Sequence, residues 1–342
     1  MNDPLARYSR QMILPGWGRE GQALLGERTV VVIGCGALGS HIASHLVRIG
    51  IGRLVLADRD FVEWHNLPRQ ALYSEQDAAE GLPKAVAAAQ RLRQLNSMVD
   101  VNEQVIDVNS DTVEELIRGA DLVLDGADNF EVRYLVNEAC VKLGIPWVYG
   151  GVLGTYGLSA AILPGETPCL RCLLGPMPAP GSVPTCETAG VLGPAVAAVA
   201  ALEVVEGLKI LLDQRQALVR SLVMVDLWTG DFERAQIQKG TTPCPVCDEG
   251  RYELLTARHG STTTVLCGRD AIQISPRPAQ SLDLPALAAR LSAIGPVSLS
   301  SHLLRFSAEG CDFTLFPDGR AILKGVSEPS VARALYARYV GS

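Results

Sequence analysis

The sequence predicts an α/β protein with a doubly wound, mostly parallel sheet and a small C-terminal α+β module. Three observations support this prediction. Short apolar runs alternate with stretches of helical periodicity from residue 28 to residue 151, which is typical of parallel sheets covered by helices. The motif GCGALG separates the first predicted strand from the first predicted helix. The 342 residues suffice for about two domains, and the pattern changes after residue 247.

The first strand, turn and helix begin at residue 28. RTVVVI (28–33) is a short apolar run, and GCGALG (34–39) follows it as a turn. SHIASHLVRIG (40–50) repeats its apolar residues at helical spacing, and RLVLAD (53–58) is the next apolar run. Parallel strands joined through a helix take a right-handed crossover. These residues therefore predict the first unit of a Rossmann-like sheet.

The alternation continues and then gives way to a strand-rich second half. The further helices are expected at 84–95, 112–117 and 131–143, and the further strands at 99–106, 121–126 and 146–151. After residue 151, predicted strands at 158–164 and 221–237 flank a long Ala/Val-rich helix at 194–212. We expect residues 1–250 to form one domain.

A separate C-terminal module is expected after a linker. Residues 251–265 are polar and lack clear periodicity, so they are predicted to be that linker. Residues 266–342 predict a small α+β module that contains two helices, four short strands and one tight turn. Two roles stay open for this module: it helps to dock a partner protein, or it contributes to stability or dimerisation.

Charge and hydropathy exclude several classes of protein. The formal net charge is −7 and the pI is about 5.4, which argues against nucleic acid or anionic lipid as the main partner. The longest apolar run, residues 191–202, is too short for a bilayer and is followed by Glu203. The N-terminal residues lack the apolar core of a secretory signal. We therefore expect a cytoplasmic protein with no membrane partner.

The glycine turn predicts a phosphate site. Gly34, Gly36 and Gly39 lie between a strand and a helix, where the backbone can approach a phosphate and the helix N-terminal amides point at it. Asp58 ends the next strand, where a carboxylate can accept both ribose hydroxyl groups. This motif alone most often indicates an NAD(P)-dependent oxidoreductase, and mononucleotide binding is the alternative.

The residues after the second strand favour ATP. Asn66, Arg69 and Gln70 follow that strand, and Lys84 comes next in GLPKA. A dinucleotide has no triphosphate for two extra cations at this place, whereas ATP has. Arg69 and Lys84 are therefore interpreted as phosphate ligands, since Arg suits bidentate contact and Lys supplies a point charge. The alternative is that both are solvated surface cations.

Asp128 is the candidate magnesium ligand. It follows the predicted strand at 121–126 in the sequence LDGADNF, and the C-terminal ends of parallel strands face the ligand crevice. Magnesium binds one or two carboxylates together with phosphate oxygens. The alternative is that Asp128 caps the following helix.

Four cysteines predict a structural zinc site. Cys169 and Cys172 form one C-x-x-C pair, Cys244 and Cys247 form the other, and 71 residues separate the pairs. Four thiolates at this spacing suit a closed tetrahedral zinc site. Such a site stabilises the fold and has no open position for a substrate. The alternative for each pair alone is a redox dithiol or a chance match.

Several motifs occurring in one order make the sequence similar to the ThiF/MoeB/HesA family of ubiquitin-activating-enzyme-like adenylyltransferases. The resemblance covers residues 7–250 and is carried by RYSRQ, GCGALG, LADRDFVEWHNLPRQ, GLPKA, LDGADN, TCETAGVLGP and the two cysteine pairs. It implies a homodimer that binds MgATP and adenylates the C-terminal glycine of a ubiquitin-like sulfur carrier protein ending in Gly-Gly. A ThiS- or MoaD-like carrier would place the enzyme in thiamine or molybdopterin biosynthesis.

The resemblance also implies roles for individual residues. Asp58 would hold the ribose, and the ligands of the ATP phosphates would be Asn66, Arg69 and Lys84. One departure is Pro68, where relatives often carry Gln, and a local backbone effect is expected from it.

Three further residues match the family pattern. Asp128 would bind the metal, and Arg10 would reach across the dimer to the triphosphate. Cys186 matches a cysteine that takes part in thioester, persulfide or acyl-disulfide chemistry, and the alternative is a bystander thiol. Two other functions stay open for the chain: an NAD(P)-dependent oxidoreductase and a binding module without catalysis.

Overall fold

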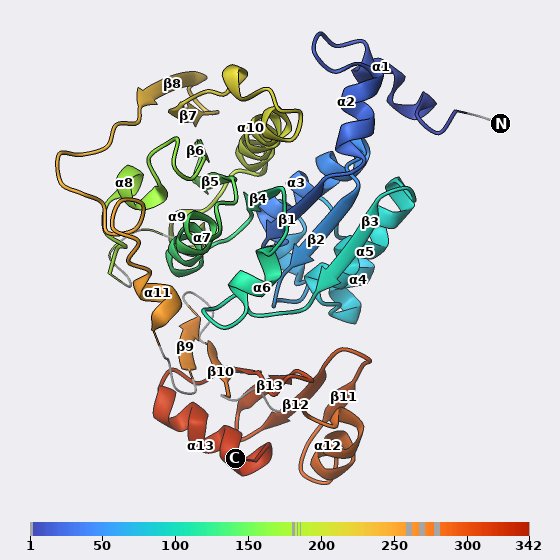
Figure 1. Cartoon of the computed structure of the whole chain (residues 1–342). Coiled ribbons are helices and arrows are strands. Elements are labelled where there is room, and N and C mark those ends of the chain that lie inside the picture. The colour runs from blue at the N-terminus through green and yellow to red at the C-terminus, as the bar shows by residue number, and fades with distance from the viewer. Residues whose placement is uncertain are drawn as a thin grey trace. The chain divides into compact units, whose positions relative to one another are not determined.

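The computed structural model describes residues 3–179, 182, 184, 186–257, 262–266, 271–276 and 281–341. For residues 186–187 and 262–266 the description is limited to the backbone. The chain forms two compact units, Met1–Ala257 and Arg258–Ser342, which run from blue to orange and from orange to red in Figure 1. Among the described residues, no helix has both the length and the apolar character needed to cross a membrane.

The first unit is built on an eight-stranded sheet with the order β3-β2-β1-β4-β5-β6-β7-β8. Its first five strands are parallel, and β6, β7 and β8 join them in antiparallel pairs. The strands are β1 (Thr29–Ile33), β2 (Arg53–Ala57), β3 (Asp100–Gln104), β4 (Leu122–Asp125), β5 (Trp147–Leu153), β6 (Tyr156–Ile162), β7 (Ser221–Asp226) and β8 (Asp231–Gln236). The predicted doubly wound, mostly parallel sheet is confirmed.

The strand order changes direction between β1 and β4, and the region outside the carboxyl ends of these strands, here termed the crevice, is where a ligand is expected. The chain runs outward from β1 to β2 and β3, and then returns to the other side of β1 as β4. Ligands of open α/β sheets bind outside the carboxyl ends of the strands at this kind of switch point. The loops after β1, β2 and β4 carry GCGALG, Asp58 and Asp128, so the topology gathers these predicted residues at one edge.

Helices cover both faces of the sheet, and the described part of the first unit contains eleven α-helices in all. They are α1 (Ser9–Met12), α2 (Gly18–Leu25), α3 (Ala37–Ile49), α4 (Glu75–Glu80), α5 (Lys84–Leu95), α6 (Val113–Ile117), α7 (Phe130–Leu143), α8 (Leu170–Leu174), α9 (Cys186–Ala189), α10 (Gly193–Leu211) and α11 (Glu253–Thr256). Alternate residues of β1 contact opposite layers: Val30 and Val32 pack with α3, α5 and α10, whereas Val31 and Ile33 pack with α6 and α7. The sheet is therefore buried on both faces, as its continuous apolar strands predict.

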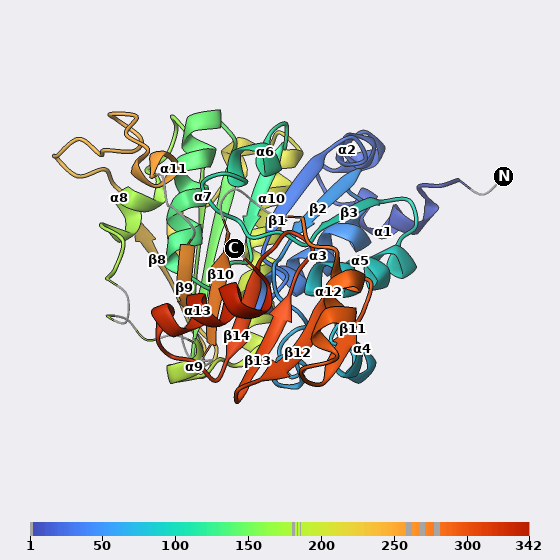
Figure 2. The same cartoon turned by 90° about the horizontal axis from the view of Figure 1, so that it is seen from below.

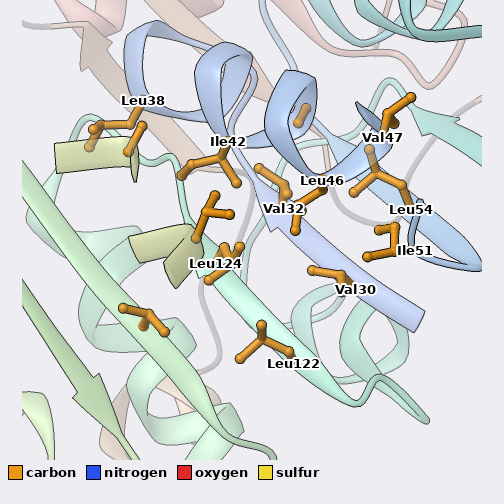
Figure 3. Packing of buried hydrophobic residues seen from close by; sticks show 14 of the residues in the cluster. Val30, Val32, Leu38, Ile42, Leu46, Val47, Ile51, Leu54, Leu122 and Leu124 are labelled. Atoms are coloured by element: carbon orange, nitrogen blue, oxygen red, sulfur yellow. The ribbon is translucent and has the colours of Figure 1, made fainter. Parts of the chain in front are cut away.

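The packing of α3 on the sheet fixes the position of the glycine turn. Ile42 and Leu46, four residues apart, lie on one helical face and contact the sheet above Val30, Val32 and Leu122 (Figure 3). All five side chains are fully buried. Each such side chain contributes about 1.5–3 kcal/mol of hydrophobic stabilisation. The close packing of α3 on the sheet therefore fixes the position of the turn at its start.

The second unit is an antiparallel sheet with two helices, shown in orange and red in Figure 2. Its strand order is β11-β12-β13-β14-β10-β9. The elements are β9 (Thr262–Leu266), β10 (Ala271–Ser275), α12 (Leu284–Leu291), β11 (Val297–Leu299), β12 (Leu304–Ala308), β13 (Cys311–Leu315), β14 (Ala321–Lys324) and α13 (Pro329–Tyr339). The rings of Phe306, Phe313 and Tyr339 pack with centroids 5.3–5.5 Å apart. The predicted α+β module therefore has its own core.

The segment expected to be a linker, 251–265, contains the helix α11 and all but the last residue of the strand β9. The Glu138 carboxylate on α7 accepts hydrogen bonds from the amides of Leu254 and Leu255 at 2.9 and 3.0 Å. These two leucines also pack against the core of the first unit. Polar residues surround this apolar pair, so the sequence did not indicate that the segment packs against the first unit.

Candidate functional site

The glycine turn forms a compact junction between β1 and α3. Gly34 has a φ of 90°, and a β-carbon there would lie 2.4 Å from the carbonyl oxygen of Gly126. A β-carbon on Gly39 would lie 1.8 Å from the carbonyl oxygen of Gly34. A β-carbon on Gly36 would meet only Gly126, at 4.0 Å. Gly34 and Gly39 thus permit close packing, while Gly36 leaves space beside the N-terminus of α3, where an anion is favoured.

Asp58 ties the glycine turn to the end of β2. Its Oδ2 accepts a hydrogen bond from the Cys35 amide at 2.6 Å, and its Oδ1 accepts one from the Asp60 amide at 2.7 Å. Burial raises the pKa of Asp58, and the positive charge of Lys84 opposes that rise. An ionised carboxylate accepts about four hydrogen bonds, so these two leave capacity for ribose hydroxyl groups.

Lys84 lies in the same region, as the sequence predicts. It is the first residue of α5, and its ammonium lies 3.1 Å from Oδ2 of Asp60. The backbone amide of Lys84 also donates to the carbonyl oxygen of Asp60 at 2.8 Å. Tyr73 adds a third link, because its hydroxyl donates to the carbonyl oxygen of Cys35 at 2.6 Å and lies 3.2 Å from that of Lys84.

Asp60 and Tyr73 were missed by sequence reasoning. The repeated acid in DRD was the one available signal for Asp60, because it stands two residues after the predicted ribose ligand. For Tyr73 the sequence offers no such signal, since its contacts depend on the folded path of the chain between β2 and α5.

Asn66 presents a buried donor in the segment after β2. It ends the short 3-10 helix at Trp64–Asn66 and is 1% exposed. Its Oδ1 accepts a hydrogen bond from the Glu63 amide at 3.0 Å, whereas its Nδ2 has no hydrogen-bond partner among the described residues. Buried polar groups are nearly always paired, so this amide marks a place for an acceptor such as a phosphate oxygen.

Arg69 lies next to the start of α10. A β-carbon built on Gly193 would be 3.7 Å from Cα of Arg69, so the two backbones approach each other closely. The Arg69 side chain is half-buried and donates to the carbonyl oxygen of His65 at 2.5 Å. The segment with Asn66 and Arg69 is thereby held against α10.

Asp128 lies exposed on the loop between β4 and α7. The cap of α7 is its neighbour Asn129, whose Oδ1 accepts the Val132 amide at 2.9 Å. The Nδ2 of Asn129 donates to Oδ1 of Asp128 at 3.1 Å. The alternative role of Asp128 as the helix cap is therefore wrong.

A buried ion pair supports the Asp128 loop from below. Arg133 on α7 donates from Nε to Oδ2 of Asp125 at 3.0 Å, and from Nη2 to the carbonyl oxygens of Ala127 and Gly150 at 2.8 and 2.9 Å. Glu203 of α10 lies fully buried in the same region. Burial raises its pKa far above the ordinary value, and the negative charge of Asp125 raises it further. Sequence reasoning did not identify this network.

Two predicted site residues remain to be placed, Arg10 and Cys186. Arg10 is exposed on α1, and Figure 1 shows α1 and α2 beyond the starting end of β1, whereas the other candidate residues follow the ends of strands. Cys186 begins α9, but its side chain lies outside the described residues.

The four predicted cysteines form a cluster that could hold a metal ion. All four Sγ atoms lie within 4.8 Å of one another. The distances are 3.7 Å between Cys169 and Cys244, 3.6 Å between Cys172 and Cys247, and 3.9 Å between Cys169 and Cys172. A tetrahedron with zinc–sulfur bonds of about 2.3 Å has edges of about 3.8 Å. The cluster therefore has the dimensions of a zinc site.

Burial affects the ionisation of the cluster. It raises the pKa of the Cys169 thiol to about 11, because a thiolate is poorly solvated there. A divalent cation among the four sulfur atoms would compensate that cost.

Comparison with known proteins supports the predicted resemblance. The ThiF family model matches residues 8–246. The chain is 42% identical over 340 residues to a sulfur carrier protein ThiS adenylyltransferase of Bacillus subtilis, covering 98% of this chain and 99% of that protein. It is 42% identical over 252 residues to a sulfur carrier protein adenylyltransferase of Thermus thermophilus, covering 72% and 92%.

A solved structure shares the fold. The crystal structure of Escherichia coli MccB with MccA-N7isoASN superposes with a TM-score of 0.62 at 25% identity, covering 72% of this chain and 75% of that chain.

Proposed function

This chain belongs to the ThiF family, and we propose on that premise that it uses ATP to adenylate the C-terminal glycine of a ubiquitin-like sulfur carrier protein. The observation that carries the proposal is the match over nearly the whole chain to a ThiS adenylyltransferase. The candidate residues at the crevice agree with it. The product is an acyl-adenylate on the carrier, and pyrophosphate is released.

The reaction requires charge neutralisation more than proton transfer. The terminal carboxylate of the carrier is already ionised at neutral pH. One of its oxygens attacks the α-phosphorus of ATP, and the bond from that phosphorus to the pyrophosphate oxygen breaks. No general base is needed, because no proton has to be removed. The site must hold two anions together and stabilise the departing pyrophosphate.

The residues at the crevice suit this task. The open space beside Gly36 admits a phosphate to the N-terminus of α3. Asp58 binds the ribose, and the unpaired Nδ2 of Asn66 donates to a phosphate oxygen. Arg69 and Lys84 neutralise the triphosphate.

The proposed enzyme binds two kinds of metal ion, magnesium and zinc. Asp128 would hold magnesium, which would neutralise phosphate charge when bound. Cys169, Cys172, Cys244 and Cys247 would hold zinc as a structural ion. The thiol cluster also agrees with a protein that acts in the cytoplasm, since thiols stay reduced there.

We further propose a homodimer in which Arg10 reaches the triphosphate of the partner subunit. The position of α1 beyond the starting end of β1 supports this assignment, because the other candidate residues follow the opposite ends of the strands (Figure 1). Cys186 is assigned to the later sulfur-transfer stage and not to adenylation, because the attack on the α-phosphorus needs no thiol.

The carrier is proposed to be ThiS-like, which would place the enzyme in thiamine biosynthesis. The match to the Bacillus subtilis protein includes the C-terminal unit, whereas the match to the Thermus thermophilus protein covers 72% of this chain. A MoaD-like carrier and molybdopterin biosynthesis are the alternative outcome of the same test.

The test is carrier-dependent exchange of pyrophosphate into ATP, with ThiS-like and MoaD-like proteins that end in Gly-Gly. We expect exchange with the ThiS-like carrier. Arg69→Ala and Asp128→Ala should abolish it, while Cys186→Ala retains it. Arg91→Ala is the matched control, because Arg91 is an exposed cation on α5. Absence of exchange with every carrier, together with tight NAD binding, would favour an oxidoreductase instead.

The C-terminal unit is proposed to help dock the carrier. A chain ending at Ala257 keeps the whole first unit. We expect it to retain exchange at high carrier concentration but to show a raised KM for the carrier. An unchanged KM together with a lowered melting temperature or a monomeric state would assign the unit to stability or dimerisation.

A further inference from the structure

Asp60 and Lys84 form an ion pair that is largely buried. The ammonium nitrogen of Lys84 lies 3.1 Å from Oδ2 of Asp60, and the two side chains are only 5% and 12% exposed. The same residues are joined through the backbone, where the Lys84 amide donates to the Asp60 carbonyl oxygen at 2.8 Å. The start of α5 is thus fixed to the end of β2 at two points.

A buried ammonium depends strongly on a counter-charge. Removing one partner of a buried pair leaves an uncompensated charge that the interior solvates poorly. An ammonium has three donors, so pairing with one carboxylate oxygen is compatible with simultaneous contact with a phosphate. Asp60 can therefore hold Lys84 in place without preventing it from binding the triphosphate.

Other charged groups surround the pair, and they are already engaged. The carboxylate of Asp58 accepts hydrogen bonds from the backbone amides of Cys35 and Asp60. Arg59 is paired with Asp107 at 2.7 Å and lies 4.0 Å from Asp60. Two further titratable neighbours are the thiol of Cys35 and the hydroxyl of Tyr73, and burial raises the pKa of both. Asp77 acts on Tyr73 and Asp128 acts on Arg59 through their charges. The carboxylate of Asp60 directly contacts the Lys84 ammonium.

We propose that Asp60 is a positioning residue for adenylation: its carboxylate holds the ammonium of Lys84 at the carboxyl end of β2 and keeps that ammonium charged. The inference rests on the proposed function, because it assigns Lys84 to the triphosphate. It adds a residue that contacts neither ATP nor the carrier and acts through Lys84.

The first test is Asp60→Asn, which preserves the size of the side chain and removes its charge. The kcat and the KM for ATP are measured by pyrophosphate exchange from about pH 6 to about pH 9. We expect kcat to fall about 10- to 100-fold with a smaller change in KM, because the displaced cation no longer meets the developing charge. Activity should also fall further towards alkaline pH, because a buried ammonium without its counter-charge loses its proton more readily.

The second test is rescue by Asp60→Asn combined with Lys84→Arg. A guanidinium stays charged throughout this pH range, so the alkaline loss should disappear even if kcat remains low. Asp107→Asn is the matched control, since it removes the carboxylate of the neighbouring Arg59 pair and should keep the wild-type pH profile. Asp60→Glu keeps the charge but moves it, so it should lower kcat without creating the alkaline loss of activity. This variant replaces Asp60→Asn in the test if Asp60→Asn does not fold.

A folded Asp60→Asn protein with wild-type kcat and pH profile would overturn the inference. So would a loss of activity that is equal at every pH and is not altered by Lys84→Arg. Failure of the proposed function gives a different result, because the wild-type protein itself would then catalyse no exchange with any carrier.

Discussion

Arg133 and Asp125 form a buried ion pair, with Nε 3.0 Å from Oδ2, directly beneath the loop that carries Asp128. Arg133→Met keeps the apolar stem and removes the guanidinium. It leaves Asp125 as an uncompensated buried charge and also frees two carbonyl oxygens. We expect a loss of about 3–5 kcal/mol in the free energy of unfolding, measured by urea denaturation.

The double variant Arg133→Met with Asp125→Leu tests the cause. Replacing both partners of a buried pair by apolar residues costs much less than removing one. We therefore expect the double variant to recover part of the lost stability. If it is no more stable than Arg133→Met alone, the uncompensated charge is not the source of the loss.

Glu203→Gln should stabilise the protein more as the pH rises. The pKa of Glu203 is raised by burial, so the folded state keeps a proton that the unfolded state releases above its ordinary pKa of about 4.3. Wild-type stability therefore falls with pH in this range, by at most about 1.4 kcal/mol per pH unit for one proton. Glutamine does not titrate, so the gain in melting temperature should be larger at pH 8 than at pH 5.

Glu206 provides the control for that experiment. It lies on the same helix, is paired with Lys209 and accepts the Val219 amide at 2.9 Å. Glu206→Gln should give no gain that rises with pH. A gain for Glu203→Gln that is identical at both pH values would show that burial of this carboxyl is not linked to its protonation.

Alanine at Gly39 and at Gly36 should separate folding from ATP binding. A β-carbon on Gly39 has no room, so we expect Gly39→Ala to lose about 3 kcal/mol or more of stability. At Gly36 the nearest neighbour is 4.0 Å away, so stability should stay within about 0.5 kcal/mol. ATP affinity should nevertheless fall at least about tenfold in Gly36→Ala, because the methyl group fills the phosphate space. Calorimetric titration with ATP decides this, and unchanged affinity would exclude that position for the phosphate.

Mixed dimers test the role of Arg10. Arg10→Ala and Arg69→Ala should each be inactive as homodimers. In a two-fold dimer that pairs one subunit of each kind, one site carries both changes and the other carries neither. A statistical mixture should therefore recover about one quarter of the wild-type exchange activity. No recovery in a verified heterodimer would indicate that Arg10 does not act across the interface.

Metal analysis tests the cysteine cluster. We expect about one zinc ion per chain, lost in Cys172→Ser together with a large drop in melting temperature, since metal binding is coupled to folding. Cys311→Ser is the control, because Cys311 belongs to the second unit. Full stability of the wild-type protein after complete chelation would contradict a structural role.

The sequence predicted the parts of the site that follow from strand order. Gly34, Asp58 and Asp128 each stand just after an apolar run, and parallel strands bring their carboxyl ends to one edge. The cysteine cluster was predictable for a different reason, since its spacing restricts the possible ligand geometry.

The contacts of the residues that sequence reasoning missed depend on the tertiary structure, because it decides which way a side chain points and which segments meet. The helix at 131–143 was predicted, yet periodicity does not tell that Arg133 points inward to Asp125. Asp60 and Tyr73 contact Lys84 only because of the path the chain takes between β2 and α5. The two N-terminal helices α1 and α2 were also not predicted, because they are short, with four and eight residues.

The cysteine cluster has a consequence for biosynthesis. Its first pair precedes α10, β7 and β8 in the chain, and its second pair follows them. A nascent chain therefore cannot complete the four-sulfur site until residue 247 has left the ribosome. By then all eight strands of the first sheet have been synthesised. Metal capture would thus come late in the synthesis of this unit, and it would link the segment before α10 to the segment after β8.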